Sequence, residues 1–210
     1  MTREREIKKV LGPLARRRED LFYNRGCFFL TPIRHLIRNV WIKPSFWGPG
    51  PIDVNWGVAL TFEPIAYLGW RYGEQVSRGA GWDVSAPGIA ERVWDLMEAE
   101  ALPPLHRIET LDDLDRFVKD RGSADSESTL LLAAARGDFT YCDQYLDARL
   151  ARPSDFKERK ERERTLAPLI SARDRAGIAR LLHEWEAFRI KALKLEKYWV
   201  PSPFPVESEG

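Results

Sequence analysis

The sequence predicts an α+β fold: an antiparallel sheet with covering helices, followed by an all-helical C-terminal part of two helical hairpins. Two patterns support this prediction. In DVNWGVALTF, at Asp53–Phe62, large apolar residues alternate strictly with small or polar ones, which is typical of a strand with one buried face. Beyond residue 128 the apolar residues recur at helical spacing throughout.

The chain is expected to contain three regions. We predict an α+β domain over residues 1–122, a helical hairpin region over residues 129–198 and a mobile, Pro-rich tail over residues 199–210. The polar segment SADSES, Ser123–Ser128, is the predicted linker between the first two regions.

The composition is that of an ordinary globular protein. Of the 210 residues, 44% are hydrophobic and 31% are charged, and this length is sufficient to bury a core. No apolar run approaches the roughly 20 residues that cross a bilayer, and MTREREIKK lacks the apolar stretch of a secretion signal. These observations predict a cytoplasmic protein without a membrane partner.

The first predicted elements are a helix and a hairpin. Thr2 can cap a helix whose apolar residues share one face, and Pro13 should end that helix near residues 11–12. The β-prone runs Leu21–Tyr23 and Cys27–Leu30 flank an Asn-Arg-Gly turn, which indicates a β-hairpin.

The next segment, TPIRHLIRNVWIKP, allows two interpretations. Apolar residues at helical spacing from Ile33 onward favour a short helix over about Pro32–Asn39, with VWIK continuing as an extended segment. The alternative for residues 32–39 is a strand, although the apolar residues alternate poorly there. The sequence favours the helix and leaves the choice open.

After the central strand, the sequence predicts one more strand and two helices. The strand is placed at Ala66–Tyr72 and is followed by a Gly-containing return loop. Proline opens the first helix at residue 87, and the Pro-Pro pair at residues 103–104 closes it. Thr110 caps the second helix.

About four helices are predicted in the C-terminal part, at Leu130–Ala135, Tyr141–Leu150, Leu166–Ile170 and Ile178–Leu195. The sequences ARGD at Ala135–Asp138 and ARD at Ala172–Asp174 are followed by similar apolar spacing, at an offset of 36 to 37 residues. Such an offset is typical of a helix-turn-helix unit, and two copies predict two helical hairpins rather than a solenoid.

Charge is unevenly distributed, although the formal net charge is only +1. Residues 1–50 carry +7, residues 51–150 carry −9 and the remainder carries +3. This polarity could steer a charged partner, or could let the basic N-terminal part pair with the acidic middle. A nucleic-acid-binding protein usually has a larger excess of Lys and Arg, so nucleic acid is not a favoured partner.

The sequence contains no motif for catalysis or metal binding. There is no G-x-S-x-G turn, no nucleotide loop of the G-x-x-x-x-G-K type, no H-E-x-x-H and no paired CxxC. Cys27 and Cys142 are interpreted as small buried thiols. We therefore predict no catalytic residue, no cofactor and no metal site, and we lean against an enzymatic function.

Three histidines are candidates for a site. His106 and His183 are interpreted as packing at the edge of the core. His35 stands between Arg34 and Arg38, and on a helix these three side chains would share one exposed face. Such a face could hold a phosphate or carboxylate, because Arg forks match these oxyanions. A solvated basic face paired with acidic residues is the simpler interpretation.

Tryptophans provide a second candidate surface. Trp56 lies on the buried face of the alternating strand, whereas Trp47 falls in a Gly/Pro turn and Trp82 follows a glycine. These two positions are harder to bury, and exposed tryptophans are frequent in the binding hot spots of protein interfaces. We predict that Trp47 and Trp82 contact a partner, with simple loop packing as the alternative.

Several features occur in a characteristic order: a helix, FYNRG, the VNWGVAL strand, WDLMEAEALPPLHRIETLDDLDRF and a helical C-terminal part. Over about residues 5–120 this order resembles a group of uncharacterised bacterial α+β domains. Some relatives of those domains lie near polymorphic toxin and immunity loci. The resemblance implies a soluble bacterial domain that binds rather than catalyses.

The sequence as a whole favours a non-catalytic protein-interaction module, with an immunity-type protein as one form of it. The alternative is a small enzyme or ligand-binding protein that holds an anionic ligand with Arg34, His35 and Arg38. Nucleic-acid binding through Arg16–Arg18 and Arg34–Lys43 is the least favoured function.

Overall fold

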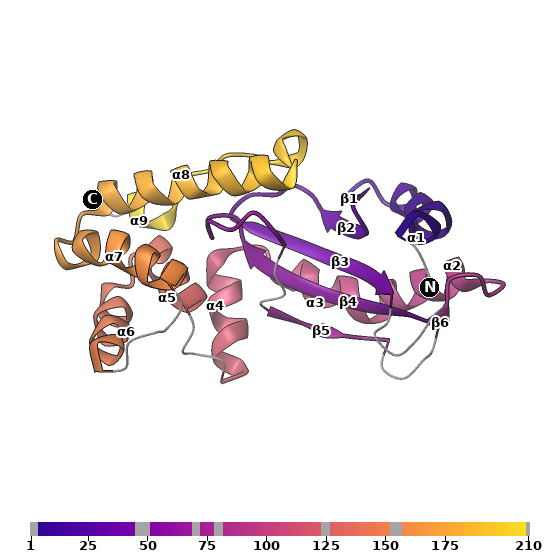
Figure 1. The fold of residues 1–210 in the computed structure, drawn as a ribbon, viewed down its shortest axis with the longest axis horizontal. Coiled ribbons are helices and arrows are strands. Elements are labelled where there is room, and N and C mark those ends of the chain that lie inside the picture. Colours follow the sequence, from indigo (N-terminus) through magenta and orange to yellow (C-terminus); the bar gives the residue numbers. More distant parts are fainter. Residues whose placement is uncertain are drawn as a thin grey trace. The chain divides into compact units, whose positions relative to one another are not determined.

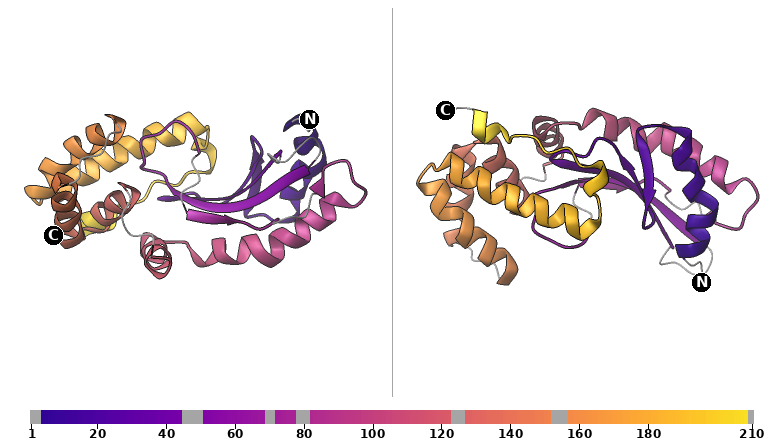
Figure 2. Two further views of the ribbon diagram at one scale, coloured as in Figure 1. Left: turned by 60° about the horizontal axis from the view of Figure 1, so that its bottom comes forward. Right: turned by 90° about the horizontal axis from the view of Figure 1, so that it is seen from above.

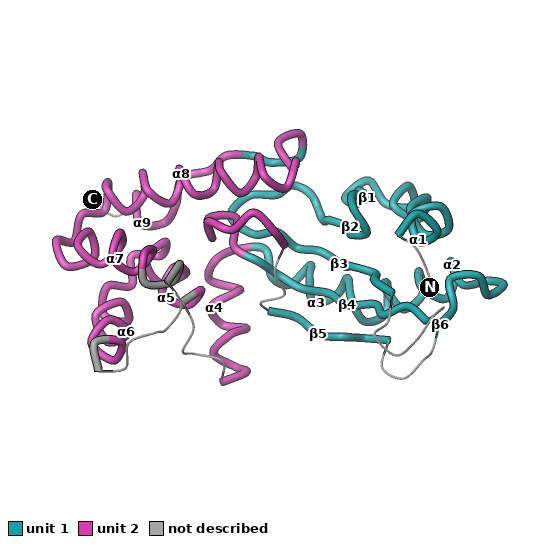
Figure 3. The backbone as a smooth tube through the Cα atoms, viewed as in Figure 1, with its two compact units in different colours: residues 1–59, 69–109, 198–200 teal, residues 60–68, 110–197, 201–210 magenta. Residues whose placement is uncertain are grey.

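The computed structural model describes residues 4–44, 51–68, 72–77, 82–122, 127–151 and 157–208. The chain divides into two compact units, which Figure 3 colours separately. The sheet unit comprises residues 1–59, 69–109 and 198–200. The helical unit comprises residues 60–68, 110–197 and 201–210.

Neither unit is a single stretch of chain. The predicted α+β domain runs to residue 122, whereas the sheet unit ends at residue 109 and resumes at residues 198–200. The predictions for Thr2, for Trp47 and for the linker residues 123–126 lie outside the described residues.

The predicted α+β class, with an antiparallel sheet and several C-terminal helices, is confirmed. Strands β1 to β5 are hydrogen-bonded in sequence order, and β6 pairs with β4 (Figure 1). The pairings β1–β2, β2–β3, β4–β5 and β4–β6 are antiparallel. The strands among the described residues are β1 (Leu21–Asn24), β2 (Cys27–Leu30), β3 (Leu36–Pro44), β4 (Pro51–Leu60), β5 (Tyr72–Gln75) and β6 (Trp82–Asp83).

The helix and hairpin predicted at the start of the chain are confirmed. Helix α1 (Glu4–Leu11) ends just before the proline, and a 3-10 turn, η1 (Gly12–Arg17), follows it. In the turn between β1 and β2, Arg25 has φ = 47° and Gly26 has φ = 83°. Two consecutive positive φ angles match the twist of the flanking strands and set the hairpin register.

The predicted helix at Pro32–Asn39 is wrong, because strand β3 begins at Leu36. All five residues from Leu36 to Val40 are buried, so both faces of the strand are covered. β3 is hydrogen-bonded to β2 and β4, and helices α1 and α3 (Leu102–Arg107) both contact it. A strand buried on both faces need not keep the period of two, and the apolar residues at positions 33, 36, 37, 40 and 41 also fit one face of a helix.

The predicted central strand is confirmed as β4. The large residues at positions 54, 56, 58 and 60 are buried, and so are the intervening residues 55, 57 and 59, so both faces of β4 are covered. At Gly57 an added Cβ would lie 2.9 Å from the Trp41 ring, so this glycine makes room for an indole of the neighbouring strand. The strand predicted at Ala66–Tyr72 is wrong for residues 66–68, which form an irregular loop, and β5 begins only at Tyr72.

A helical run follows β6 and extends alongside the strands (Figure 2). It consists of α2 (Ile89–Leu96), the π-helical turn η2 (Met97–Ala101) and α3. Pro103 and Pro104 were expected to close the helix after residue 102, but α3 continues to Arg107. Both prolines lie in the first turn of α3, where the backbone N–H groups have no helical acceptor and proline costs little.

The helical unit contains the predicted helices. They are α4 (Leu111–Asp120), α5 (Glu127–Arg136), α6 (Phe139–Ala151), α7 (Lys157–Ser171), α8 (Arg175–Leu193) and α9 (Pro205–Ser208). The Thr110 cap of α4 is confirmed: its hydroxyl accepts a hydrogen bond from the Asp113 N–H, and the Asp113 carboxylate accepts one from the Thr110 N–H.

The two helical hairpins, α5–α6 and α7–α8, end their first helices with the same motif. The N–H of Asp138 donates to the Ala133 carbonyl at 2.9 Å, and 36 residues later the N–H of Asp174 donates to the Leu169 carbonyl at 2.9 Å. Each aspartate then caps the following helix by accepting a hydrogen bond from the N–H three residues on. The similar sequences ARGD and ARD therefore correspond to a repeated turn.

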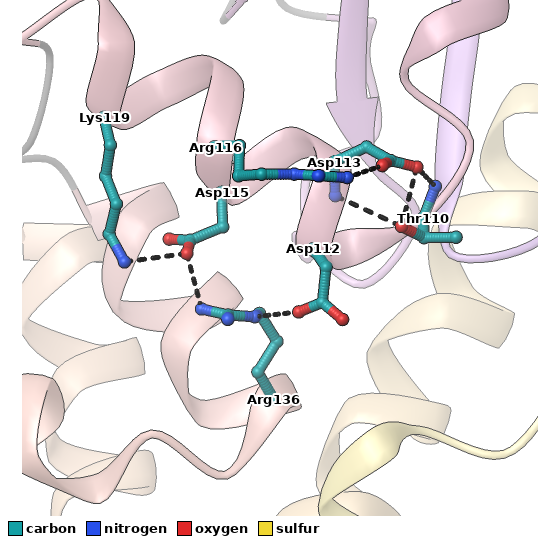
Figure 4. Close-up of polar contacts among 7 residues, drawn as sticks. All are labelled: Thr110, Asp112, Asp113, Asp115, Arg116, Lys119 and Arg136. Carbon is teal, nitrogen blue, oxygen red and sulfur yellow. Dashed lines mark hydrogen bonds and ion pairs between the residues drawn. The ribbon is translucent and has the colours of Figure 1, made fainter.

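Helix α4 is tied to α5 by ion pairs along one face (Figure 4). Arg136, in the last turn of α5, contacts Asp112 at 2.7 Å and Asp115 at 2.8 Å. Arg116 and Lys119 pair with the same helix's own aspartates, Asp113 and Asp115. One arginine thus bridges two carboxylates a helical turn apart and fixes the α4–α5 contact.

The segment predicted to be a mobile tail carries two buried anchors, Phe204 and Val206. The Phe204 ring packs edge-on against Phe62, with ring centroids 5.0 Å apart. Among the described residues, no helix combines the length and the apolar character needed to cross a membrane.

Candidate functional site

A pocket of about 320 Å³ opens in the sheet unit. Its lining comes from the residue before β1, from the segment that leads into β3, from α3 and from the connector after α3. The lining residues are Asp20, Thr31, Pro32, Arg34, Leu36, Arg38, His106 and Glu109. Five of these eight residues are charged or bear an imidazole, and the volume is near the lower end for ligand sites.

The backbone of β3 and of the bend before it decides which predicted site residues reach the pocket. Side chains alternate in direction along a strand, so Leu36 and Arg38 of β3 share one side and line the pocket, and Arg34 in the bend joins them. His35, in the same bend, is half-buried and is not part of the lining. The structure brings together two of the three predicted residues and leaves the third outside.

Arg38 is the buried cation of the pocket. Its side chain is only 8% exposed, and its Nη1 donates to the Leu105 carbonyl at 3.4 Å and contacts Glu109 Oε1 at 3.5 Å. Burial lowers the pKa of Arg38, the Glu109 carboxylate opposes that change, and the like charge of Arg34 adds to it. An arginine remains protonated despite such a change, so the pocket holds a permanent, poorly solvated positive charge.

Arg34 is the exposed cation of the pocket. It has no hydrogen bond or ion pair to any other residue that the structure describes. Because Arg34 and Arg38 are close enough for their charges to repel, an anion that contacts both would relieve the repulsion.

The third basic group is His106, which the sequence interpretation had assigned to packing. Its Nε2 lies 3.3 Å from Arg18 Nη2 and 3.5 Å from Asp20 Oδ2. Arg18 itself donates two hydrogen bonds to Asp20, at 2.8 and 3.0 Å. These hydrogen bonds lower the pKa of Asp20 despite partial burial, so Asp20 stays ionised.

The chain gives no local signal for the role of His106. His106 lies at the end of α3, 86 residues beyond Asp20 in the sequence, and the packing of α3 on β3 brings the two together. Only knowledge of that packing could have placed His106, rather than His35, in the pocket.

The two tryptophans predicted as contact residues stand apart from the pocket. Trp82 is half-buried in β6, where it pairs with Ile52 of β4. Trp47 lies outside the described residues. A contact role for these tryptophans stays a prediction.

A second group of charged residues lies in the core of the helical unit. Arg189 on α8 and Glu63 form an ion pair at 2.9 Å, and both side chains are fully buried. Glu186, also fully buried, accepts a hydrogen bond from Thr61 at 2.5 Å. This cluster is sealed, so it fixes the loop of residues 60–68 to α8 rather than offering an open site.

Metal ligands and thiols are two further candidates for a site in the described part of the chain. No group of three or more His, Cys, Asp or Glu residues is arranged there to hold a metal ion. Burial raises the pKa of Cys27 and that of Cys142 to about 12, so both stay protonated and weakly nucleophilic at neutral pH.

Comparison of the chain with protein-family profiles, with curated proteins and with solved structures found no match.

Proposed function

We propose that this chain is a binding protein that takes an anionic group, a carboxylate or a phosphate, into the pocket of the sheet unit. The observation that supports this proposal is the pair of arginines, Arg34 and Arg38, in one small pocket. One is buried with only long contacts and the other is exposed, so a ligand oxyanion can reach both guanidinium groups.

The proposal is binding without catalysis. An acid–base mechanism in this pocket would use the Asp20 carboxylate and the His106 imidazole. Both groups already contact Arg18 and each other. Asp20 has a lowered pKa and is a weak base, so the arrangement favours holding a charge over moving a proton.

Isothermal titration of the full chain with inorganic phosphate and with acetate tests this function. We expect binding that weakens with added salt, and Arg34→Gln should weaken it by about tenfold, the effect of losing one charge-assisted contact. Arg92→Gln is the matched control, because Arg92 is exposed on α2 and lies outside the pocket lining. Equal losses in both variants, or no binding by the wild type, would contradict the proposal.

A protein-interaction role is the second candidate, including an immunity-type role in a bacterial host. Two exposed aromatic side chains of the helical unit favour it: Tyr67 is 65% exposed and Phe188 is 52% exposed. Arg189, next to Phe188, donates to the Tyr67 carbonyl at 3.4 Å, which holds the two segments to each other. Large exposed aromatics are enriched at binding hot spots.

The test of this second function is reconstitution. A partner captured from the native host is purified, and the complex is formed again from the two isolated proteins. Phe188→Ala should weaken the complex by about tenfold or more, whereas Arg34→Gln should leave it unchanged. A complex indifferent to Phe188→Ala would exclude this surface.

A further inference from the structure

We propose that Glu109 is an internal competitor for Arg38, so that an anionic ligand enters the pocket by displacing the Glu109 carboxylate. This inference rests on the proposed anion-binding function and adds its regulation. It makes Glu109 the residue that sets the affinity of the pocket.

The contact between Glu109 and Arg38 is loose. Their closest atoms are 3.5 Å apart, beyond the 2.7–2.9 Å that is usual for a charge-assisted hydrogen bond between a guanidinium and a carboxylate. Glu109 is 63% exposed, whereas Arg38 is 8% exposed. The carboxylate therefore keeps most of its hydration while the guanidinium has lost most of its own, and the pair gains little from its charge.

Arg38 has no short contact elsewhere in the described residues. Its other hydrogen bond, to the Leu105 carbonyl, is also long at 3.4 Å. A guanidinium has five N–H donors, and a buried one is destabilised when these donors lack close acceptors. A small carboxylate or phosphate that enters the pocket can supply short hydrogen bonds that Glu109 does not make.

The backbone around Glu109 allows its side chain to leave without loss of the fold. Ile108 before it is buried, and Thr110 after it is fixed by the capping box of α4. Glu109 lies between these two anchors in an irregular segment, with its side chain largely in solvent. Displacement therefore takes place through a change of side-chain rotamer and leaves the backbone in place, and exposed side chains change rotamer rapidly.

The charges of the lining support the same inference. With Glu109 in place, two arginines face two carboxylates, and Asp20 is already held by Arg18. Removing the charge of Glu109 leaves Arg38 and Arg34 with no carboxylate of their own in the pocket. An incoming anion then meets a larger uncompensated positive charge.

The experiment compares the wild type, Glu109→Gln and Glu100→Gln by isothermal titration with inorganic phosphate and, separately, with acetate. Glu100 is the matched control, since it is an exposed carboxylate of η2 outside the pocket lining. We expect Glu109→Gln to bind the preferred anion about fivefold more tightly, as for loss of one weak competing ion pair. The two probes show whether a phosphate or a carboxylate is preferred.

Each outcome decides one claim. If the wild type binds an anion and Glu109→Gln binds it equally or more weakly, the competitor role is overturned and the binding function stands. If no variant binds either anion, the binding function is overturned and the competitor role with it. Thermal unfolding followed by circular dichroism serves as the folding control. Because Glu109 is largely exposed and its contact with Arg38 is long, its substitution should change the melting temperature by only a few degrees.

Discussion

The Arg189–Glu63 ion pair shows how a pair of buried charges affects the stability of this protein. The pair is fully buried and the guanidinium also donates to the carbonyls of Glu63 and Tyr67. Each charge was removed from water, and it is stable there because the other charge and the backbone acceptors replace that water. Removing one partner is therefore much more destabilising than the pair is stabilising.

Arg189→Ala should lower the free energy of unfolding by about 3–5 kcal/mol, because the Glu63 carboxylate stays buried without its cation. Arg180→Ala, at an exposed position of the same helix, should change it by less than about 0.5 kcal/mol. Urea denaturation followed by circular dichroism measures both. A loss below about 1 kcal/mol for Arg189→Ala would show that the helical unit relaxes to hydrate Glu63.

The candidate site also shows where residue-level prediction from the sequence ends. The sequence indicated Arg34, His35 and Arg38 as an alternative anion site on a helix, and Arg34 and Arg38 line the pocket. The choice of imidazole depended on the backbone, since the bend before β3 leaves His35 outside the lining and α3 supplies His106. Contacts made across α3 and β3 are not encoded in any local pattern.

At the scale of elements, the repeated turn between helices is the most informative feature. The first helix of each hairpin ends in a left-handed residue, Gly137 with φ = 75° and Arg173 with φ = 53°. Glycine adopts this conformation freely, whereas a residue with a Cβ pays about 1–2 kcal/mol. Arg173 offsets part of this cost through its ion pair with Asp143 and its contact with the Phe139 ring.

Gly137→Ala should therefore lower the free energy of unfolding by about 1–2 kcal/mol. Space is not the main obstacle, because the nearest atom to an added Cβ is the flexible end of Arg175, at 3.1 Å. Thr140→Ala, at an exposed position of α6, is the control and should be nearly neutral. Chemical denaturation of the two variants checks the prediction, and a neutral Gly137→Ala would mean that this turn rearranges.

Elements with a local sequence signal were predictable from the sequence, and β4 shows that this holds even for a strand buried on both faces. The capped helix α4 and the hairpin β1–β2 have local signals, a capping box and an Asn-x-Gly turn, that act without the rest of the fold. β3 has no such signal. Both of its faces are buried, as in β4, but Leu36 and Ile37 are adjacent apolar residues, so the alternation is lost. The continuation of α3 through two prolines likewise depends on the π-helical turn before it.

At the scale of the whole molecule, the division into units depends on contacts far apart in the sequence. The polar composition of residues 199–210 indicated a mobile tail, yet Phe204 and Val206 are buried in the helical unit. Composition averages over a segment, and two anchors among polar residues are enough to order it. The unit boundary at residue 109 has no Pro, Gly or Ser cluster that the sequence could have revealed.

Truncation after Lys197 should destabilise both units. It removes the buried side chains of Phe204 and Val206, whose burial contributes about 3–6 kcal/mol together. It also removes the Tyr198 ring, which stacks on the Phe22 ring with centroids 3.6 Å apart. Thermal unfolding of residues 1–197 is compared with that of residues 1–208, which keep all these contacts. Equal melting temperatures would show that the C-terminal segment contributes nothing to stability.

The bridge between Ile33 and Trp199 also has a consequence for biosynthesis. The Ile33 N–H donates to the Tyr198 carbonyl and the Val200 N–H donates to the Ile33 carbonyl, at 3.0 and 2.8 Å. At translation rates of 5–20 residues per second, the ribosome takes roughly ten to thirty seconds to proceed from the first partner to the second. During that interval the nascent sheet presents Phe22 and the backbone of Ile33 uncovered. A chaperone that recognises exposed apolar segments should therefore associate with this chain until residues 198–200 have emerged from the ribosome.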